Sequence, residues 1–387
     1  MAPTTRNGMV ATKGPNGEQI SSQRIDVSTK VWAYDPPGAP AMKLLSDRSA
    51  SSKAISYTYY HLEDEPVPYV FSSTAGASDS ATSLTIDANA DAVQVGDLIR
   101  VPATGEVVEV TAVNAGTGAL TITRGALGTT AASIPSSAQV LNLRAAQPEG
   151  SKAPDALATV KTRIDNYTQI LRTPYHMSRT LVETQHYTGD ELAYTQRKAG
   201  EAHARAWEEI FLHGVPSEDI SGARPVRTTG GLDHFIQTNV LAAGGALAEK
   251  DWIDYLREIF RFSVNPSSKK RVLLASGELV ATISGWGLEK LRHNDRASDV
   301  HGFTVTSYVS PFGTVEIVHH PLLEGPYAGT GYLLDFDGLS KKVLHGTDLR
   351  TDIQDNDEDS RRGEYLTEQG FMVAQEKCHG LITGVTY

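Results

Sequence analysis

The acidic run at residues 355–359 has the spacing that comes nearest to a ligand site in this 387-residue sequence. Asp355, Asp357 and Asp359 occupy the first, third and fifth positions of a calcium loop, where such loops supply oxygen ligands. The sixth position needs a glycine but is Ser360, and the twelfth needs a bidentate glutamate but is Leu366. We therefore expect a solvated acidic loop, with a calcium site as the less favoured alternative.

Three other groups of residues have types that can bind metals or anions, or act as nucleophiles. His319 and His320 are adjacent, and adjacent side chains of a strand point to opposite faces, so the two do not easily share a metal. The Lys-Lys-Arg run at 269–271 is a small basic patch between a predicted helix and a predicted strand. Cys378 stands in a strand-like run, which favours a buried apolar role over a nucleophilic one.

Two short motifs resemble known signatures without fulfilling them. The glycine-rich stretch 325–331 lacks the Gly-Lys-Ser/Thr of a phosphate-binding loop, so we expect a turn. Asn-Tyr-Thr at 166–168 fits a glycosylation sequon, but no secretory signal is recognised, so the match is expected to be chance. We predict no catalytic, cofactor-binding or metal-binding residues, no cofactor and no enzyme activity. An enzyme whose site the sequence hides is kept as an alternative.

Composition narrows the class of protein further. The formal net charge is −11, whereas a dedicated nucleic-acid binder would carry a basic surface. A single cysteine excludes an internal disulfide framework and indicates a reducing cytosol. No run of about 18 apolar residues occurs, so no membrane partner is expected.

Helical periodicity is clearest at residues 189–213. Thr188 and Glu191 fit a capping box, and Gly214 is the expected C-cap. Residues at roughly helical spacing predict the buried stripe: Leu192, Ala199, Ala202, Ala206 and Ile210, widened by Trp207 and Phe211. Two further helices are predicted over 251–262 and 276–292. Strand-like runs dominate both ends of the chain, so the predicted fold class is α+β.

Residues 72–146 form a segment of different character. Its cations are Arg100, Arg124 and Arg144, and short strands rich in Ala, Ser, Thr, Val and Gly follow one another. Residues 114–118 read as a hairpin loop, and after it alternation places Leu120 and Ile122 on one face. The corner at 124–130 needs the backbone freedom of its two glycines. The spacing predicts a small β-barrel or β-sandwich inserted in a larger domain.

The order of these features resembles the major capsid proteins of tailed double-stranded-DNA bacteriophages, which have the Hong Kong 97-type fold. The stretches that carry the resemblance are 149–156 with 163–181, 191–214, 228–236, 310–323 and 366–385. It covers roughly residues 150–387 well and the preceding part only in outline.

The resemblance implies a phage capsid fold divided into the family's parts. These are an N-terminal arm (1–48), expected to be extended, an extended loop (49–160) with its β-insertion at about 72–146, a peripheral domain (161–230) with a spine helix at 189–213, an axial domain (231–325) and return strands (326–387).

The resemblance also implies a structural function rather than a catalytic one. The chain would assemble into hexamers and pentamers of an icosahedral shell that encloses double-stranded DNA. Its partners would be further copies of itself, the portal, and a scaffold or decoration protein, with non-specific proximity to packaged DNA. It would be made in the host cytoplasm and reside in the virion capsid. We expect the β-insertion to stabilise or decorate contacts between capsomers.

Some members of the family join subunits by a lysine–asparagine bond in the extended loop. No lysine lies between Lys53 and Lys152, so we expect no such covalent bond at the tip of the loop.

Two alternatives share part of the pattern. An encapsulin-like compartment protein has the same fold, although the β-insertion disfavours it. A tail or surface adhesive protein would suit the Thr- and Gly-rich strands but not the long helix.

Overall fold

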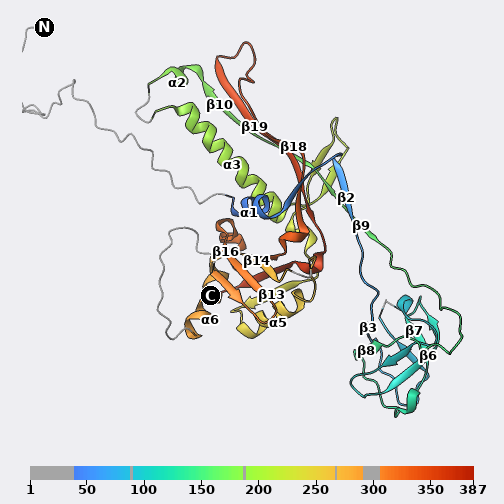
Figure 1. Ribbon diagram of the computed structural model, residues 1–387. Coiled ribbons are helices and arrows are strands. Elements are labelled where there is room, and N and C mark those ends of the chain that lie inside the picture. Colours follow the sequence, from blue (N-terminus) through green and yellow to red (C-terminus); the bar gives the residue numbers. More distant parts are fainter. Residues whose placement is uncertain (1–38, 88–89, 186–188, 266–267, 291–305) are drawn as a thin grey trace, which may run out of the picture. The chain divides into compact units, whose positions relative to one another are not determined.

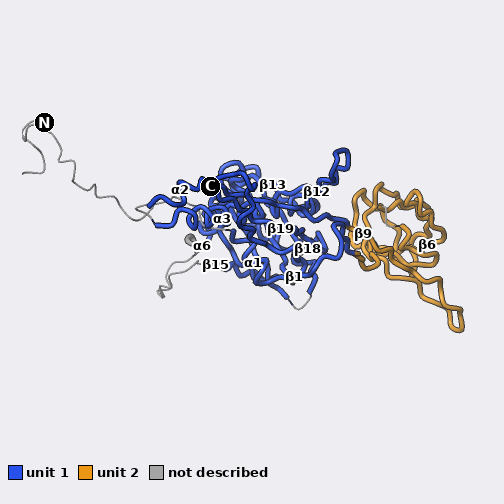
Figure 2. Tube along the Cα trace, turned by 90° about the horizontal axis from the view of Figure 1, so that it is seen from above, with its two compact units in different colours: residues 1–61, 165–387 blue, residues 62–164 orange. Residues whose placement is uncertain are grey.

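The computed structural model describes all residues except 1–38, 88–89, 186–188, 266–267 and 291–305, and the chain forms two compact units (Figures 1 and 2). Unit 1 comprises residues 1–61 and 165–387, and unit 2 comprises residues 62–164. The strands β2 (Thr58–Glu63) and β9 (Thr162–Tyr167) pair with each other, so unit 2 is inserted between two strands of one ribbon.

Unit 1 contains both longer helices and single turns. The helices are α1 (Pro40–Arg48), α2 (Arg179–Glu183), α3 (Glu191–His213), α4 (Leu232–Phe235), α5 (Glu249–Ile259) and α6 (Gly277–Lys290), and the 3₁₀ turns are η3 (Pro321–Leu323), η4 (Gly325–Tyr327), η5 (Phe336–Gly338) and η6 (Glu376–Cys378).

The strands of unit 1 form two larger sheets and a small hairpin. They are β1 (Ala50–Lys53), β10 (Gln169–Ser178), β11 (Ser217–Asp219), β12 (Val226–Thr228), β13 (Val240–Gly245), β14 (Lys270–Ala275), β15 (Thr306–Val309), β16 (Thr314–His319), β17 (Gly331–Leu334), β18 (Leu339–Arg350), β19 (Ser360–Val373) and β20 (Gly380–Val385).

Helix α3 forms where the sequence predicts it, with a different N-terminal cap. The 23-residue helix is about 35 Å long. Its N-cap is Asp190, whose carboxylate accepts hydrogen bonds from the N–H groups of Leu192 and Ala193. The predicted capping box is therefore wrong, because Glu191 is the first helical residue; Thr188 lies outside the described residues. Gly214 is the C-cap, as expected.

The buried face of α3 differs in part from the predicted stripe. Ala202 is exposed, while His203 and Glu208 are buried. The buried row advances by four residues per turn, through Ala199, His203, Trp207 and Phe211. Because the prediction used apolar residues alone, it did not include His203 and Glu208.

Helix α3 packs on a four-stranded sheet with the order β1-β18-β19-β10 (Figure 1). β19 is antiparallel to both β18 and β10, while β1 runs parallel to β18. The ring of Phe371 in β19 makes edge contacts with Trp207 and Phe211 of α3, with centroids 5.9 and 5.0 Å apart. These aromatic contacts fix the helix to the sheet.

A six-stranded mixed sheet forms the other layer of unit 1, in the order β13-β20-β17-β14-β16-β15. Helices α5 and α6 supply apolar side chains to its core, including Trp252, Leu256 and Leu279. β14 pairs in parallel with β16 and is buried from its second residue to its last. This explains its continuous apolar run Val-Leu-Leu-Ala rather than an alternating one.

Unit 2 is a small antiparallel β-barrel. Its elements are β3 (Val70–Ser72), β4 (Ser83–Thr85), η1 (Ala90–Ala92), β5 (Leu98–Arg100), β6 (Val107–Asn114), β7 (Ala119–Thr123), η2 (Ala126–Gly128) and β8 (Gln139–Asn142). The sheet order is β3-β8-β5-β6-β7-β4, and a bridge between Ser73 and Ile86 joins the two edge strands. Leu120 and Ile122 of β7 are buried and their neighbours face outward, as the alternation predicts.

The predicted extended arm is helical in its described part. Residues 1–38 lie outside the described residues, but Pro40–Arg48 form α1. Proline is favourable at the first helical position, and Ala41 and Leu45 are fully buried in the core that also holds Trp207. The helix is therefore stabilised by tertiary packing, which a local reading of its proline-rich sequence misses.

Candidate functional site

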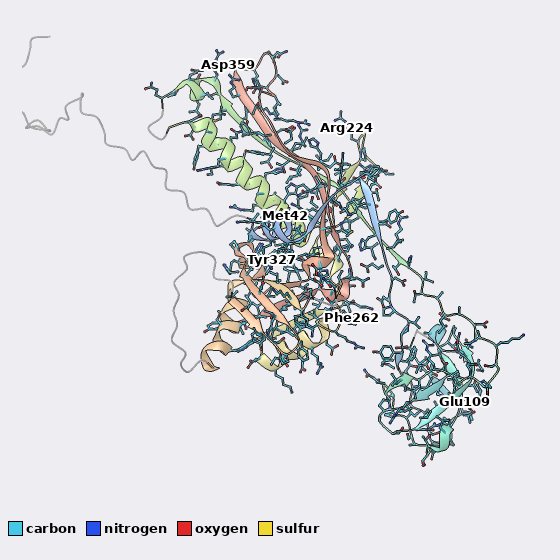
Figure 3. The ribbon with its side chains drawn as sticks, in the orientation of Figure 1. Met42, Glu109, Arg224, Phe262, Tyr327 and Asp359 are labelled. Atoms are coloured by element: carbon cyan, nitrogen blue, oxygen red, sulfur yellow. The ribbon has the colours of Figure 1, made fainter. Side chains whose placement is uncertain are left out.

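The predicted acidic loop is exposed and its carboxylates contact basic side chains. Asp359 lies 3.6 Å from Arg179, and Glu358 lies 2.8 Å from His176. Figure 3 places Asp359 beyond α3, far from Phe262. Among the described residues, no group of three or more His, Cys, Asp or Glu side chains could hold a metal ion.

The adjacent histidines face opposite directions, as expected. The side chain of His319 is 52% exposed and lies 3.1 Å from Glu324, whereas that of His320 is fully buried. His320 Nδ1 accepts a hydrogen bond from the N–H of Leu322, so Nε2 carries the proton that is donated to Glu208 at 2.6 Å. The pair therefore has a structural setting rather than a shared ligand.

Glu208 connects α3, α1 and the turn after β16. Its Oε1 accepts from the N–H of Ala41 at 2.6 Å, and its Oε2 accepts from the N–H of Met42 at 2.8 Å. Ala39, the N-cap of α1, provides no side-chain cap, so Glu208 satisfies amide groups that the helix leaves open. The negative carboxylate also lies at the positive end of the helix dipole.

A buried charge pair lies at the start of β14. The predicted basic patch at 269–271 is only partly right, because the Arg271 side chain is fully buried 3.1 Å from Asp335. The backbone N–H of Asp335 donates to His379 Nδ1 at 3.2 Å. Burial lowers the pKa of His379 to about 4 and raises the pKa of Asp335. The positive charge of Arg271 by itself would lower the pKa of Asp335, but the effect of burial is larger.

Polar residues also join α3 to its sheet. His203 Nδ1 lies 2.8 Å from the hydroxyl of Thr173 in β10, and Nε2 lies 2.8 Å from that of Thr367 in β19. The indole N–H of Trp207 donates to Nε2, so Nδ1 carries the proton. Burial lowers the pKa of His203, which favours this neutral form.

Two other predicted candidates are buried. Asn166 of the sequon is 3% exposed, and its amide donates to the carbonyl groups of Gly230 and Phe371. Cys378 is buried, as expected. The stretch 325–331 begins with the turn η4, also as expected.

Unit 2 contains a buried ion pair at the glycine corner, which comprises residues 124–130. Glu106 has no exposed side-chain surface, and it receives two hydrogen bonds from the guanidinium group of Arg124, at 2.8 and 2.7 Å. It also accepts from the backbone N–H groups of Gly125 and Ala132, both at 3.1 Å. Burial raises the pKa of Glu106, but these hydrogen bonds outweigh burial and hold the pKa below its usual range.

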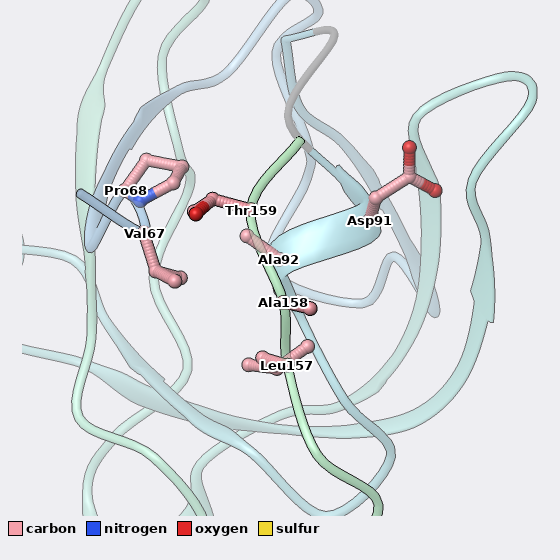
Figure 4. Close-up of a pocket in the computed structure, with 7 residues that line it drawn as sticks. All are labelled: Val67, Pro68, Asp91, Ala92, Leu157, Ala158 and Thr159. Carbon is pink, nitrogen blue, oxygen red and sulfur yellow. The ribbon is translucent and has the colours of Figure 1, made fainter. Parts of the chain in front are cut away.

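A recess of about 170 Å³ opens on unit 2 (Figure 4). Most of the side chains that line it are apolar, namely Val67, Pro68, Ala92, Leu157 and Ala158, and Asp91 and Thr159 complete the lining. It holds no paired acid and base and no nucleophile, so its chemistry favours an apolar side chain over a reacting substrate.

Exposed apolar side chains are concentrated in and beside the ribbon strand β2. Between residues 55 and 69 they are Ile55, Tyr57, Tyr60, Leu62 and Tyr69, each at least 45% exposed. A second group surrounds the β11–β12 hairpin, namely Val215, Ile220 and Val226. Such surfaces are typical of protein–protein contacts. No described helix is long and apolar enough to cross a membrane.

Comparison with known proteins places these surfaces in context. The family model for the SU10 major capsid protein matches residues 8–386. A curated major capsid protein of Pseudomonas phage PaMx41 is 24% identical over 310 residues, which cover 77% of this chain and 72% of the relative.

Solved structures share the fold at low identity. A chain from Gordonia phage Cozz aligns with a TM-score of 0.53 and 11% identity, over 98% of this chain and 99% of that chain. The capsid protein of a native GTA particle aligns with a TM-score of 0.51 and 10% identity, over 94% and 96%.

Proposed function

Because this chain belongs to the SU10 major capsid protein family, we propose that its copies assemble into hexameric and pentameric capsomers of an icosahedral shell around double-stranded DNA. The chain is a phage major capsid protein, a structural component of the virion capsid. Its α+β architecture is the phage capsid fold that the sequence resemblance implied. The family assignment sets aside the encapsulin-like and adhesive alternatives.

The apolar surface of the β2 segment is the observation that carries the assembly proposal. A monomer would leave Ile55 fully exposed and Leu62 and Tyr69 more than half exposed, all within fifteen consecutive positions. Burying such side chains against another copy removes apolar area from water, at about 25 cal/mol per Å². Stable interfaces of about 1,600 Å² need several such segments.

The division of the chain into assembly parts is kept as a proposal. In it, the extended loop of residues 49–160 lies across a neighbouring subunit, and the insertion at about 72–146 stabilises contacts between capsomers. The arm (1–48), peripheral domain (161–230), axial domain (231–325) and return strands (326–387) form the rest of the subunit. Portal and scaffold or decoration proteins are the proposed further partners, and synthesis is proposed to occur in the host cytoplasm.

Electron microscopy of the purified full chain tests the assembly. After size-exclusion chromatography at low and high salt, we expect closed shells or rings of five and six subunits. Leu62→Asp should reduce assembly while leaving the unfolding midpoint of the isolated chain unchanged. A folded chain that stays monomeric, alone and when coexpressed with neighbouring phage genes, would contradict the proposal.

A further inference from the structure

Leu127 is held in an unusual conformation at the glycine corner of unit 2. Its backbone angles are φ 55° and ψ 27°, in the left-handed region that side chains with a Cβ disfavour. Gly125 and Gly128 on either side also have positive φ, which glycine adopts at little cost. The Leu127 side chain is nevertheless 76% exposed, so its packing against the described residues does not account for the strained backbone.

Hydrogen bonds to the buried carboxylate of Glu106 hold the corner that carries Leu127. The buried carboxylate of Glu106 binds Arg124 and the backbone N–H groups of Gly125 and Ala132. Arg124 also donates to the carbonyl groups of Ser78 and Ala132. A side chain on a fixed support loses little conformational freedom on binding, which is the property of an anchor residue at an interface.

The apolar recess of unit 2 has the size that such an anchor requires. A cavity of about 150 Å³ holds a benzene molecule. The recess of about 170 Å³ therefore has room for the four side-chain carbons of leucine. Val67, Pro68, Ala92 and Leu157 would contact those carbons.

The corner and the recess lie toward opposite ends of the barrel. The hydroxyl of Thr129 in the corner accepts a hydrogen bond from the backbone N–H of Val107 at the start of β6. β5 runs antiparallel to β6, and β3 runs in the same direction as β5 because each is antiparallel to β8. Ala92 precedes β5 and Pro68 precedes β3, so the recess lies toward the other end. Leu127 therefore cannot fill the recess of its own chain.

We propose that Leu127 of one copy inserts into the recess of unit 2 in a second copy. This inference rests on the proposed function, which brings many copies together. Because the two surfaces differ, the contact is heterologous and joins barrels head to tail, as in closed rings. The partner is thus a second copy of this chain, recognised by one apolar side chain and one apolar recess.

Site-directed disulfide formation tests the contact directly. In particles assembled from the Leu127→Cys, Ala158→Cys variant, oxidised glutathione should produce multimers on non-reducing gels. Ser137→Cys, Ala158→Cys is the matched control, because Ser137 is also exposed and has φ 62° but lies outside the corner. The native Cys378 is buried and stays in place. Intact particles with no multimers, or with equal amounts in the control, would overturn this inference and leave the proposed function standing.

A glycine substitution separates this role from a merely structural one. Leu127→Gly relieves the left-handed backbone, so unit 2 should unfold at a higher temperature. The same variant should weaken association between copies by ~10-fold or more. Ser137→Gly should stabilise unit 2 without affecting association. Association of Leu127→Gly equal to that of the unmodified chain would contradict the inference, whereas failure of the unmodified chain to assemble would count against the proposed function itself.

Discussion

At the scale of single residues, Glu208 has the largest predicted effect on stability. Glu208→Ala removes the cap of α1 and the partner of His320 together, and it leaves the N–H groups of Ala41 and Met42 unsatisfied. Leaving a donor without its acceptor in a buried site costs about 1–3 kcal/mol, and Glu208 is the acceptor for three donors. We expect a fall of that order in the free energy of unfolding, measured by urea titration.

The neighbouring position provides the control for this prediction. Glu209 is also a helix glutamate but is exposed, so Glu209→Ala should change the free energy of unfolding by less than about 0.5 kcal/mol. Equal effects at the two positions would show that the α1 cap contributes nothing.

His379 gives a second residue-scale prediction, which concerns pH. Its pKa is lowered from 6.5 to about 4 by burial. Above pH 6.5 the residue is neutral in both states, and between pH 6.5 and 4 the unfolded state takes up the proton first. Stability should therefore fall over this window as pH decreases, by up to about 3 kcal/mol.

A variant that cannot titrate isolates the contribution of His379. Asp335, whose backbone N–H donates to the imidazole, is present in both proteins, so its own titration largely cancels in the difference. Urea titrations of the unmodified chain and of His379→Gln from pH 7 to 4 should converge toward acidic pH. Parallel pH profiles would refute the burial argument.

At the scale of elements, the Glu106–Arg124 pair should control the stability of the barrel. Glu106→Gln keeps the size of the side chain but leaves the buried guanidinium without its counter-charge, at a cost of about 3 kcal/mol or more. Glu109→Gln in β6, three residues further along the chain, is the control, because Glu109 is exposed. Unit 2 contains no tryptophan, so hydrogen exchange of residues 62–164 is the suitable measurement. Protection should fall throughout the barrel in Glu106→Gln alone.

The elements also show how far the sequence predicts this fold. The C-cap of α3, the hairpin loop at 114–118 and the alternation of β7 depend on neighbouring residues, and all three predictions are confirmed. The contacts of Glu208 join positions up to 167 residues apart, so no local pattern reveals them. The helical state of α1 depends on the same contacts. The left-handed conformation of Leu127 was likewise hidden, because leucine carries no turn signal.

At the scale of the whole molecule, unit 2 is inserted between β2 and β9. The stability of unit 2 can therefore change separately from that of unit 1. Each unit has its own buried core, with Trp207 and Trp252 in unit 1 and Phe71 and Ile99 in unit 2. Changes in the barrel core can therefore weaken unit 2 while the α3 sheet stays folded. Assembly then depends on both units being folded in every copy.

The absence of lysine between Lys53 and Lys152 leads to the last prediction, which concerns whole particles. A lysine–asparagine bond needs a primary amine, and residues 54–151 contain none. Mature particles boiled with reductant should therefore run as a single band near 41.7 kDa. Multimers that survive reduction would show another covalent bond. The Leu127→Cys, Ala158→Cys particles should differ only without reductant, since a disulfide is then the sole covalent link. If non-covalent interfaces alone hold the shell together, each engineered disulfide should raise the temperature at which the shell disassembles.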